Sequence, residues 1–555
     1  MPEGDVISAI HHMMHRHIMQ YHRKHKQPMQ AHLVLYPRAF TIGTKEKSYV
    51  TCTAKRQGYN EALEPCPEDF TVNKWDMQKA EGDERRWKKR KDKAKYEGRS
   101  YAYLLKPLSS GELIVNARGK ELFIACGYHG VRIHLGLEAT ILPLPRDVYD
   151  QIVATDIPGP NDDKKKAEQM RSFPIPSEFY VPNSQDSNDR SINIFAAFVS
   201  EENAFVVVDF ARLVRLHVIS LARQWLPDDV HTNSPMWTLL WDDAHGPDWV
   251  SERDSAIDRL TQWRSEVLER YKEKGPSVGA AGLVHILCNR QDVFNGFGQH
   301  LANDLLYKLA WWPGIPAWVV CQSDSLFAAL QQELVTMAAE FRTKKYYKLV
   351  CGSVNDANPL VFHDISHIRY VGQYVLVYRK AVVHVPVDLY REYLYAGLLD
   401  ENHTIGEPYD VPEDSEELKS LENCTKWTRA EVRQFAHGSH KFYSIIKAKR
   451  PADWTWQGVL TGQAGDEIDI RSPSRCYQTT LGISQFRTQV QNRVDIRKEL
   501  AMTEVSRGGR PKINRTGKQG RPSISMPQAK RQRMDKGLQR DLAVLQHQQQ
   551  NTASG

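Results

Sequence analysis

Two consecutive apolar runs, residues 192–199 and 204–210, constrain the fold of this chain more than any other part of its sequence. Both are rich in Val, Ile, Phe and Ala, and the polar residues 200–203 separate them. Runs of this length that are bounded by a polar turn are typical of neighbouring buried strands. The pair therefore predicts two strands of a mixed α/β unit.

The regions on either side of this pair predict an α+β multidomain protein. Short β-branched and aromatic runs separated by Gly, Pro or charged residues make 31–155 a β-rich domain. A polar, proline-containing stretch, 156–190, is typical of a linker. The two strands, with apolar faces that predict helices at 211–226 and 251–274, make 191–300 a mixed α/β unit.

Residues 1–30 and 373–504 have helical patterns of different kinds. The first segment is rich in His, with His11 and His15 one turn apart, and its basic side predicts a solvated arm. The second is mainly helical by pattern, and Thr428 and Glu431 have the spacing of a capping box. The helices expected in the second segment span residues 387–399, 415–422, 428–447 and 481–504.

The positive charge of the chain is concentrated near its C-terminal end. The formal net charge is +7, and residues 501–555 contain seven Arg and four Lys against three acidic residues, which is +8. The other 500 residues therefore sum to −1. Residues 505–555 are also rich in Gly, Pro, Ser and Gln, which predicts a disordered basic tail that binds a polyanion.

The composition excludes several classes of protein. Thirteen Trp, twenty-three Tyr and seventeen Phe supply enough apolar surface for several cores, so disorder throughout is excluded. No window has the roughly 18 to 20 uninterrupted apolar residues of a membrane-spanning helix. The sequence shows no secretory signal and no cysteine spacing typical of disulfides or structural zinc, which indicates a reducing compartment.

A strongly basic run lies inside the β-rich domain, at residues 85–95. It contains eight cations and one anion and must be exposed, because burial of an unpaired ammonium is prohibitive. The run is a candidate nuclear import signal, a nucleic-acid contact or a solvated helix. Its candidate contact residues are Arg85, Arg86, Lys88, Lys89, Arg90 and Lys91.

A tryptophan-dense segment, residues 304–320, has three Trp within eight residues and two Pro three residues apart. Its β-branched end and the later runs 346–353 and 359–362 predict short strands around a tight arch. Together they predict a small SH3-like barrel at residues 302–372.

This segment resembles the PWWP family of chromatin-reading barrels. The matching residues are Asp304, Leu305, Tyr307, Lys308, Pro313, Pro316, Ala317 and Val319. The resemblance implies an SH3-like barrel with an aromatic pocket for a histone tail or another peptide. The pocket candidates are Tyr307, Trp311, Trp312 and Trp318. Clustered aromatic side chains of this kind also serve as ordinary core, which is the alternative interpretation.

Two copies of Gly-Arg-Pro flanked by cations, in residues 506–512 and 518–522, resemble the AT-hook. An AT-hook places an extended Arg in the narrow minor groove of A·T-rich DNA. The candidate DNA-binding residues are Arg507, Arg510, Lys512, Arg515, Lys518, Arg521, Lys530, Arg531 and Arg533. Residues 530–533 also resemble a short import signal, so we expect a nuclear location.

One cluster offers an enzymatic alternative. Asp242, Asp243, His245 and Asp248 follow an expected strand at 236–240, where carboxylates could hold a divalent metal and a hydrolytic water. The same residues also fit an acidic loop that caps the next helix. The sequence contains no nucleophile elbow, phosphate-binding loop or zinc-protease motif.

These patterns favour a nuclear, chromatin-associated protein that binds DNA or nucleosomes, and histone tails through its barrel, without enzymatic activity. We expect no cofactor and no membrane partner. A metal-dependent nucleic-acid-processing enzyme and a nucleic-acid-packaging structural protein are the two alternatives.

Overall fold

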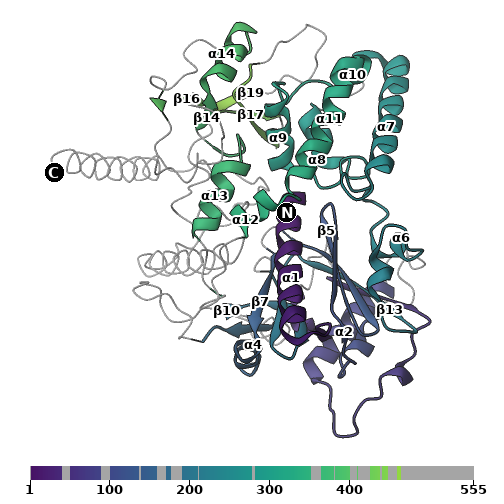
Figure 1. The fold of residues 1–555 in the computed structure, drawn as a ribbon. Coiled ribbons are helices and arrows are strands. Elements are labelled where there is room, and N and C mark those ends of the chain that lie inside the picture. Colours follow the sequence, from purple (N-terminus) through teal and green to yellow (C-terminus); the bar gives the residue numbers. More distant parts are fainter. Residues whose placement is uncertain are drawn as a thin grey trace, which may run out of the picture. The chain divides into compact units, whose positions relative to one another are not determined.

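The computed structural model describes residues 2–40, 51–88, 100–136, 139–158, 171–176, 191–209, 212–277, 282–351, 360, 364–380, 382–399, 409–410, 426–437, 440–447 and 459–463. All of them belong to one unit of the chain, Met1–Asp495. They form an α+β fold with several sheets (Figure 1). No helix in these ranges is long and apolar enough to cross a membrane.

The first five-stranded sheet contains the two apolar runs as an antiparallel pair, which confirms that prediction. Its order is β3-β1-β11-β12-β7. The strands are β1 Gln30–Leu35, β3 Gly111–Glu112, β7 Ala139–Pro145, β11 Ile194–Ser200 and β12 Asn203–Asp209. Every residue of β11 is buried, so this strand lies at the centre of the core.

The second five-stranded sheet has the order β2-β13-β6-β5-β4. Its strands are β2 Cys52–Gln57, β4 Ile114–Arg118, β5 Glu121–Cys126, β6 His129–His134 and β13 Arg215–Leu221. β13 lies parallel to β2 and antiparallel to β6. The helix predicted at 211–226 is therefore wrong, because its apolar residues are buried on both faces of a strand.

The two sheets share one core, so the predicted boundary between a β-rich domain and a mixed α/β unit is also wrong. Leu122 and Ile124 of β5 belong to the core that includes the first sheet. Phe123, between them, points to the other face of β5, which Trp225 and Trp241 cover. Each sheet is completed by strands that are distant in the sequence. Side chains alternate between the two faces of each strand, and their burial on both faces stabilises the sheets.

Smaller elements surround the sheets. They are α2 Lys74–Lys88, α4 Arg146–Val153, α6 Trp237–Leu240, the strands β8 Ile157–Pro158, β9 Arg171–Pro174 and β10 Ser191–Ile192, and the 3-10 turns η1 Pro37–Ala39, η2 Glu61–Leu63, η3 Ala102–Leu104 and η5 Pro227–Val230. Phe173 in β9 is fully buried, so this part of the predicted linker 156–190 belongs to the fold. The strand expected at 236–240 is the short helix α6.

The region expected to form a barrel, 302–372, is helical where it is described. Its helices and those before it are α7 Arg253–Lys274, α8 Leu283–Asn289, α9 Gln299–Lys308, α10 Ala317–Gln322, α11 Asp324–Glu340, α12 Lys344–Val350 and α13 Asp364–Tyr374, with the turn η6 Gly275–Ser277. Every residue of α9 from 300 to 307 is buried, so this helix is surrounded by the core. Pro316 caps α10 and does not form an arch between strands. The barrel prediction is therefore wrong, while the helix expected at 251–274 is confirmed as α7.

Two three-stranded sheets follow, with orders β14-β16-β15 and β18-β17-β19. Their elements are β14 Val382–Pro386, α14 Val387–Tyr395, β15 Tyr409–Asp410, β16 Lys426–Glu431, β17 Arg433–His437, β18 His440–Ser444 and β19 Val459–Gln463. α14 confirms the first helix expected in this region. The helix at 428–447 is wrong, since Thr428 lies in the strand β16 and opens no helix. The helices expected at 415–422 and 481–504 lie outside the described residues.

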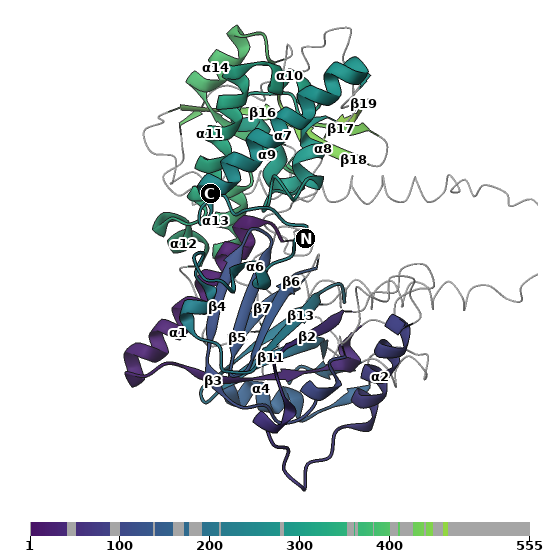
Figure 2. The same ribbon diagram turned by 90° about the vertical axis from the view of Figure 1, so that its right-hand side faces the viewer.

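The first helix, α1 Gly4–His25, packs along the second sheet and is not the solvated arm expected at 1–30. It contacts β4, β5, β7 and α12 (Figures 1 and 2). Asp5, Ile7, Ile10 and Met14 are buried, and the cations of its last turn face solvent. The helix is amphipathic as its sequence predicts, but its apolar face belongs to the core.

Candidate active site

A tight turn between β4 and β5 places Lys120 against the segment before α9. Gly119 adopts the left-handed conformation, with φ +55°. A Cβ at this position would lie 1.9 Å from Asn295 Oδ1, so only glycine allows this approach. The Gly119 N–H donates to Asp248 Oδ2 at 3.0 Å, which fixes the turn.

Lys120 is a buried primary amine, with 7% of its surface exposed. Its Nζ donates to the carbonyl of Phe297 at 2.6 Å, and Gln291 Nε2 donates to the same oxygen at 2.7 Å. Burial lowers the pKa of Lys120 below its usual range, although the charge of Glu3 acts in the opposite direction. Within the described ranges no carboxylate lies at ion-pair distance from this ammonium. A lysine in such surroundings is easier to deprotonate than one in water.

Glu3 lies at the start of α9, where its carboxylate accepts three backbone hydrogen bonds. Oε2 accepts from Gly298 at 2.8 Å and from Leu301 at 2.9 Å, and Oε1 accepts from His300 at 2.9 Å. The N-terminal end of a helix favours a negative charge, because its N–H groups lack partners within the helix. Glu3 therefore anchors the beginning of the described chain to α9.

The Phe297–Gly298 peptide group joins the two residues. Lys120 contacts its carbonyl oxygen and Glu3 contacts its N–H. These two groups point from opposite edges of one planar unit. An amine and a carboxylate from chain positions more than a hundred residues apart thus meet at one peptide bond.

A buried ionic network supports this arrangement from the other side of α9. His300 Nε2 lies 3.0 Å from Asp304 Oδ2, and its Nδ1 lies 3.5 Å from Asp5 Oδ2. Burial alone lowers the pKa of His300, but Asp304 and Asp5 raise it to about 10. Burial raises the pKa of Asp5, which also accepts from the Tyr370 hydroxyl at 2.7 Å. The network ties α1, α9 and α13 together.

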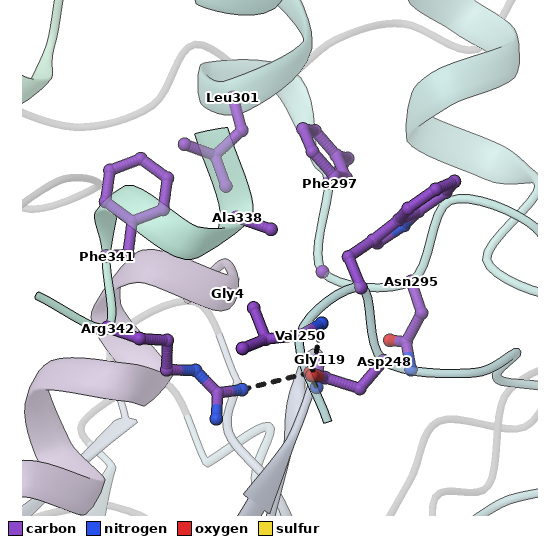
Figure 3. Close-up of a pocket in the computed structure, with 12 residues that line it drawn as sticks. Gly4, Gly119, Asp248, Val250, Asn295, Phe297, Leu301, Ala338, Phe341 and Arg342 are labelled. Atoms are coloured by element: carbon purple, nitrogen blue, oxygen red, sulfur yellow. Dashed lines mark hydrogen bonds and ion pairs between the residues drawn. The ribbon is translucent and has the colours of Figure 1, made fainter. Parts of the chain in front are cut away.

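A small cavity of about 30 Å³ adjoins the Gly119 turn (Figure 3). Its walls include Gly4, Gly119, Phe297 and Arg342. Arg342 donates to Asp248 Oδ2 at 3.0 Å, drawn as a dashed line in Figure 3. Burial alone would raise the pKa of Asp248, but Arg342 and backbone N–H groups hold it below its usual range. The cavity has room for a water molecule.

The aromatic pocket candidates form no cage. Trp312 and Trp318 are buried, and Tyr307 is 8% exposed. Trp318 stacks on Tyr271. Trp312 packs edge-on against aromatic rings of β17 and β18. Trp311 is partly buried against the same core. These side chains fill the core, because their segment is helical and does not curl into a barrel.

The acidic cluster divides between two places. Asp248 belongs to the Gly119–Arg342 contacts and caps the turn before α7 through Ser251. Asp243 is exposed. His245 and Asp242 lie beside Glu121, which sequence reasoning did not single out.

The basic candidates fall almost wholly outside what the structure describes. Arg85 is exposed near the end of α2. Arg86 and Lys88 belong to the same helix, and their side chains are not described. Lys89, Arg90 and Lys91 and all of the tail candidates, Arg507, Arg510, Lys512, Arg515, Lys518, Arg521, Lys530, Arg531 and Arg533, lie outside the described residues.

Sequence reasoning missed both Glu3 and Lys120. A usable signal was present in the Gly-Lys pair between two predicted strands, which is typical of a tight turn. A second signal was the Gly296–Gly298 spacing before an apolar helical pattern, which allows a close backbone approach at a helix start. Nothing in the sequence indicated that these segments meet.

Comparisons with known proteins return structures only. No family model and no curated protein matches the chain. One matching structure is Lactococcus lactis Fpg bound to DNA that contains an abasic site, with 11% identity and a TM-score of 0.32 over 62% of this chain and 85% of that chain. Another is MutM bound to DNA that contains carbocyclic 8-oxo-G, with 11% identity and a TM-score of 0.32 over 62% and 84%. At these values the likeness carries no argument about activity.

The expectation of a chromatin reader that binds histone tails through a barrel is corrected by the structure. The segment assigned to histone binding is helical and largely buried. The nuclear location, the AT-hooks and the packaging alternative are not tested and stay predictions.

Proposed function

We propose that this chain is a DNA-processing enzyme that acts where a base is damaged or missing, with Lys120 as the nucleophilic amine. One observation carries the proposal: the Lys120 amine and the Glu3 carboxylate contact the two edges of one buried peptide group. Both are kept out of water, and within the described ranges the Lys120 amine has only a backbone carbonyl oxygen as a hydrogen-bond partner. Buried amines beside carboxylates are typical of sites that form covalent bonds to carbonyl carbons.

The chemistry that suits this amine is Schiff-base formation. A sugar without a base opens to an aldehyde, and the Lys120 nitrogen can attack its C1′ carbon. Loss of water from the adduct gives a protonated imine, whose positive charge acidifies the C2′–H. Loss of that proton forms a C2′–C3′ double bond while the C3′–O bond breaks and the 3′ phosphate leaves. Glu3 is the carboxylate positioned to exchange protons during these steps.

Cations beside the cavity support a DNA partner. Arg342 lines the cavity, and Lys344 and Lys345 are exposed at the start of the next helix, α12. Phosphate contacts by such cations give affinity that does not depend on sequence. The basic tail, residues 505–555, would add to it in the same way.

The substrate has to open the site. The cavity of about 30 Å³ holds water but no nucleotide. Enzymes that act on bases extrude the target nucleotide from the duplex into a pocket. The close backbone approach of Gly4, Gly119 and Gly296 marks the seam that must separate. The DNA in the matching structures, which contains an abasic site, 8-oxo-G or an oxidised pyrimidine, agrees with this substrate class.

Borohydride trapping tests the proposal directly. The full chain is mixed with duplex DNA containing an abasic site, and borohydride reduces any imine to a stable amine. Denaturing gels then show a covalent protein–DNA band, and peptide mapping locates it. We expect the label on Lys120 and its loss in Lys120→Met. Lys106→Met is the matched control, because Lys106 also donates to backbone carbonyls but lies in a different loop.

Each outcome of the trapping experiment either supports or overturns the proposed reaction. Loss of the band in Lys120→Met, with the band retained in Lys106→Met, supports the assignment. A wild-type chain that gives no band over intact DNA overturns the proposed reaction. A label on another amine, such as that of Pro2 if Met1 is removed, overturns the role of Lys120.

A further inference from the structure

Three potential metal ligands converge beside the Lys120 turn from separate segments. Glu121 opens β5 and pairs directly with His134 at the end of β6. His245 lies in the loop after α6. Residues paired across antiparallel strands project from the same face. One ligand atom from each of the three side chains lies within 4.8 Å of the other two.

The separations fit a small metal ion. Glu121 Oε1 lies 2.9 Å from His134 Nε2, and Glu121 Oε2 lies 3.2 Å from His245 Nδ1. Asp242 Oδ2 lies 3.8 Å from His134 Nε2. Ligand atoms around tetrahedral zinc are about 3.3 Å apart, given metal–ligand distances near 2.0–2.1 Å. The two separations from the Glu121 carboxylate, one from each of its oxygens, lie within about 0.5 Å of that value.

Two atoms of the cluster are buried without a hydrogen bond. The Glu121 side chain is completely shielded from solvent. Its Oε1 and the Nδ1 of His245 form no hydrogen bond of acceptable geometry, although nitrogen and oxygen atoms lie nearby. Buried polar atoms are nearly always partnered, so each exception requires an explanation. A ligand shared by these atoms is such an explanation.

We propose that Glu121, His134 and His245 bind a zinc ion. Imidazole nitrogen and carboxylate oxygen are ordinary zinc ligands, and these three leave one position of a tetrahedral site for a further ligand. Arg132 faces two carboxylates, 3.5 Å from Glu121 Oε1 and 3.4 Å from Asp242 Oδ2. The positive charge of Arg132 balances one of these two negative carboxylates, so the other is available to balance the charge of the metal ion.

The site would fasten the turn that carries Lys120. Glu121 is the next residue after Lys120, and Arg118, before it, donates to the His245 carbonyl at 3.1 Å. The ion and this hydrogen bond together would join both sides of the turn to residues 241–248. The role is structural, and its test does not depend on the DNA reaction.

The experiment measures metal, not activity. The full chain is purified without a histidine tag or chelator, and its zinc content is measured by mass spectrometry of the elements. Chelator-stripped protein is then titrated with zinc, and with cobalt, whose visible absorption is intense only in tetrahedral sites. The variants are His134→Gln and His245→Gln. The control is His15→Gln, because His15 is exposed and stacks with His11 in the other histidine cluster.

We expect one zinc per chain, a zinc-dependent rise in Tm, and tetrahedral cobalt absorption. His134→Gln and His245→Gln should weaken zinc binding more than about tenfold, while His15→Gln keeps it. Wild-type protein that holds no zinc and shows no tetrahedral cobalt spectrum overturns the proposal without any variant. So does a folded His134→Gln/His245→Gln double variant that binds zinc as tightly as the control.

Discussion

Replacing Gly298 by Ala tests the contact between Glu3 and the start of α9. The Gly298 backbone is extended, with φ −134° and ψ −156°, so the backbone itself accepts alanine. The cost comes from space, because a Cβ there would lie 2.4 Å from Glu3 Oε1 and 2.5 Å from its Cδ. The Glu3 carboxylate has to leave its position among the three N–H groups.

The magnitude follows from those hydrogen bonds. A hydrogen bond to a charged group contributes about 1.5–3 kcal/mol, so the loss of one or two lowers the free energy of unfolding by about 1.5–6 kcal/mol. Gly82→Ala is the matched control, because Gly82 lies inside α2 with no atom within 4 Å of the added Cβ. It should raise the free energy of unfolding by about 0.5–1 kcal/mol.

Urea unfolding followed by circular dichroism measures both variants. In a Glu3→Ala background the added Cβ meets no carboxylate, so Gly298→Ala should then cost less than about 0.5 kcal/mol. An equal cost of Gly298→Ala in both backgrounds would refute the contact as its cause. A neutral Gly298→Ala in the wild-type background would refute the geometry itself.

Three further outcomes are expected. The stability contributed by His300 is complete below its unfolded-state pKa of about 6.5 and is lost as the pH rises through the folded-state pKa of about 10. The Tm advantage of wild type over His300→Gln should therefore shrink between neutral and strongly alkaline pH, and a constant gap contradicts it. Removing residues 505–555 takes away eleven cations and should flatten the salt dependence of DNA binding, whereas an unchanged slope shows that the tail is not the anchor. Replacing Arg510 and Arg521 together by Ala should remove any preference for A·T-rich over G·C-rich duplexes in competition, and a retained preference excludes the AT-hook interpretation.

The sequence predicted correctly those elements whose local pattern fits only one type of secondary structure. The strands β11 and β12 follow from two apolar runs around a polar turn, and α7 and α14 follow from helical spacing. Where an apolar run fits both periods, the prediction was wrong. Residues 218–221 are buried on both faces of a sheet, so they show no alternation that separates a strand from a helix.

The tryptophan-dense segment shows a different limit. The Trp and Pro residues of this segment suggested strands, but Leu301, Leu305 and Leu306, at and just before its start, have helical spacing and lie in α9. The prediction gave more weight to the presence of Trp and Pro than to the spacing of the apolar residues. It is this spacing that distinguishes a helix from a strand. Likewise, Thr428 and Glu431 have the spacing of a capping box but lie in the strand β16. The pairing of β16 with β14 overrides this local helix signal.

The candidate site was beyond local reasoning for a topological reason. Glu3, Lys120 and Phe297 meet only because α1 packs on the β4–β5 sheet and α9 begins beside the turn between those strands. A single sequence carries no record of such long-range contacts. The histidine and acidic residues of the loop after α6 were noticed, but their partners Glu121 and His134 lie on strands of another segment.

Lys120→Met separates the energetic role of Lys120 from its proposed chemistry. Burying an ammonium with a carbonyl as its hydrogen-bond partner costs stability, because the lost hydration exceeds what one such bond returns. In Lys120→Met the Phe297 carbonyl keeps its hydrogen bond from Gln291, so no buried acceptor is orphaned. The free energy of unfolding should therefore be unchanged within about 1 kcal/mol or higher than that of wild type. Covalent trapping should be lost in the same protein. A residue kept for structure predicts the reverse, a variant that unfolds more easily and still traps DNA, and that result would remove Lys120 from the reaction.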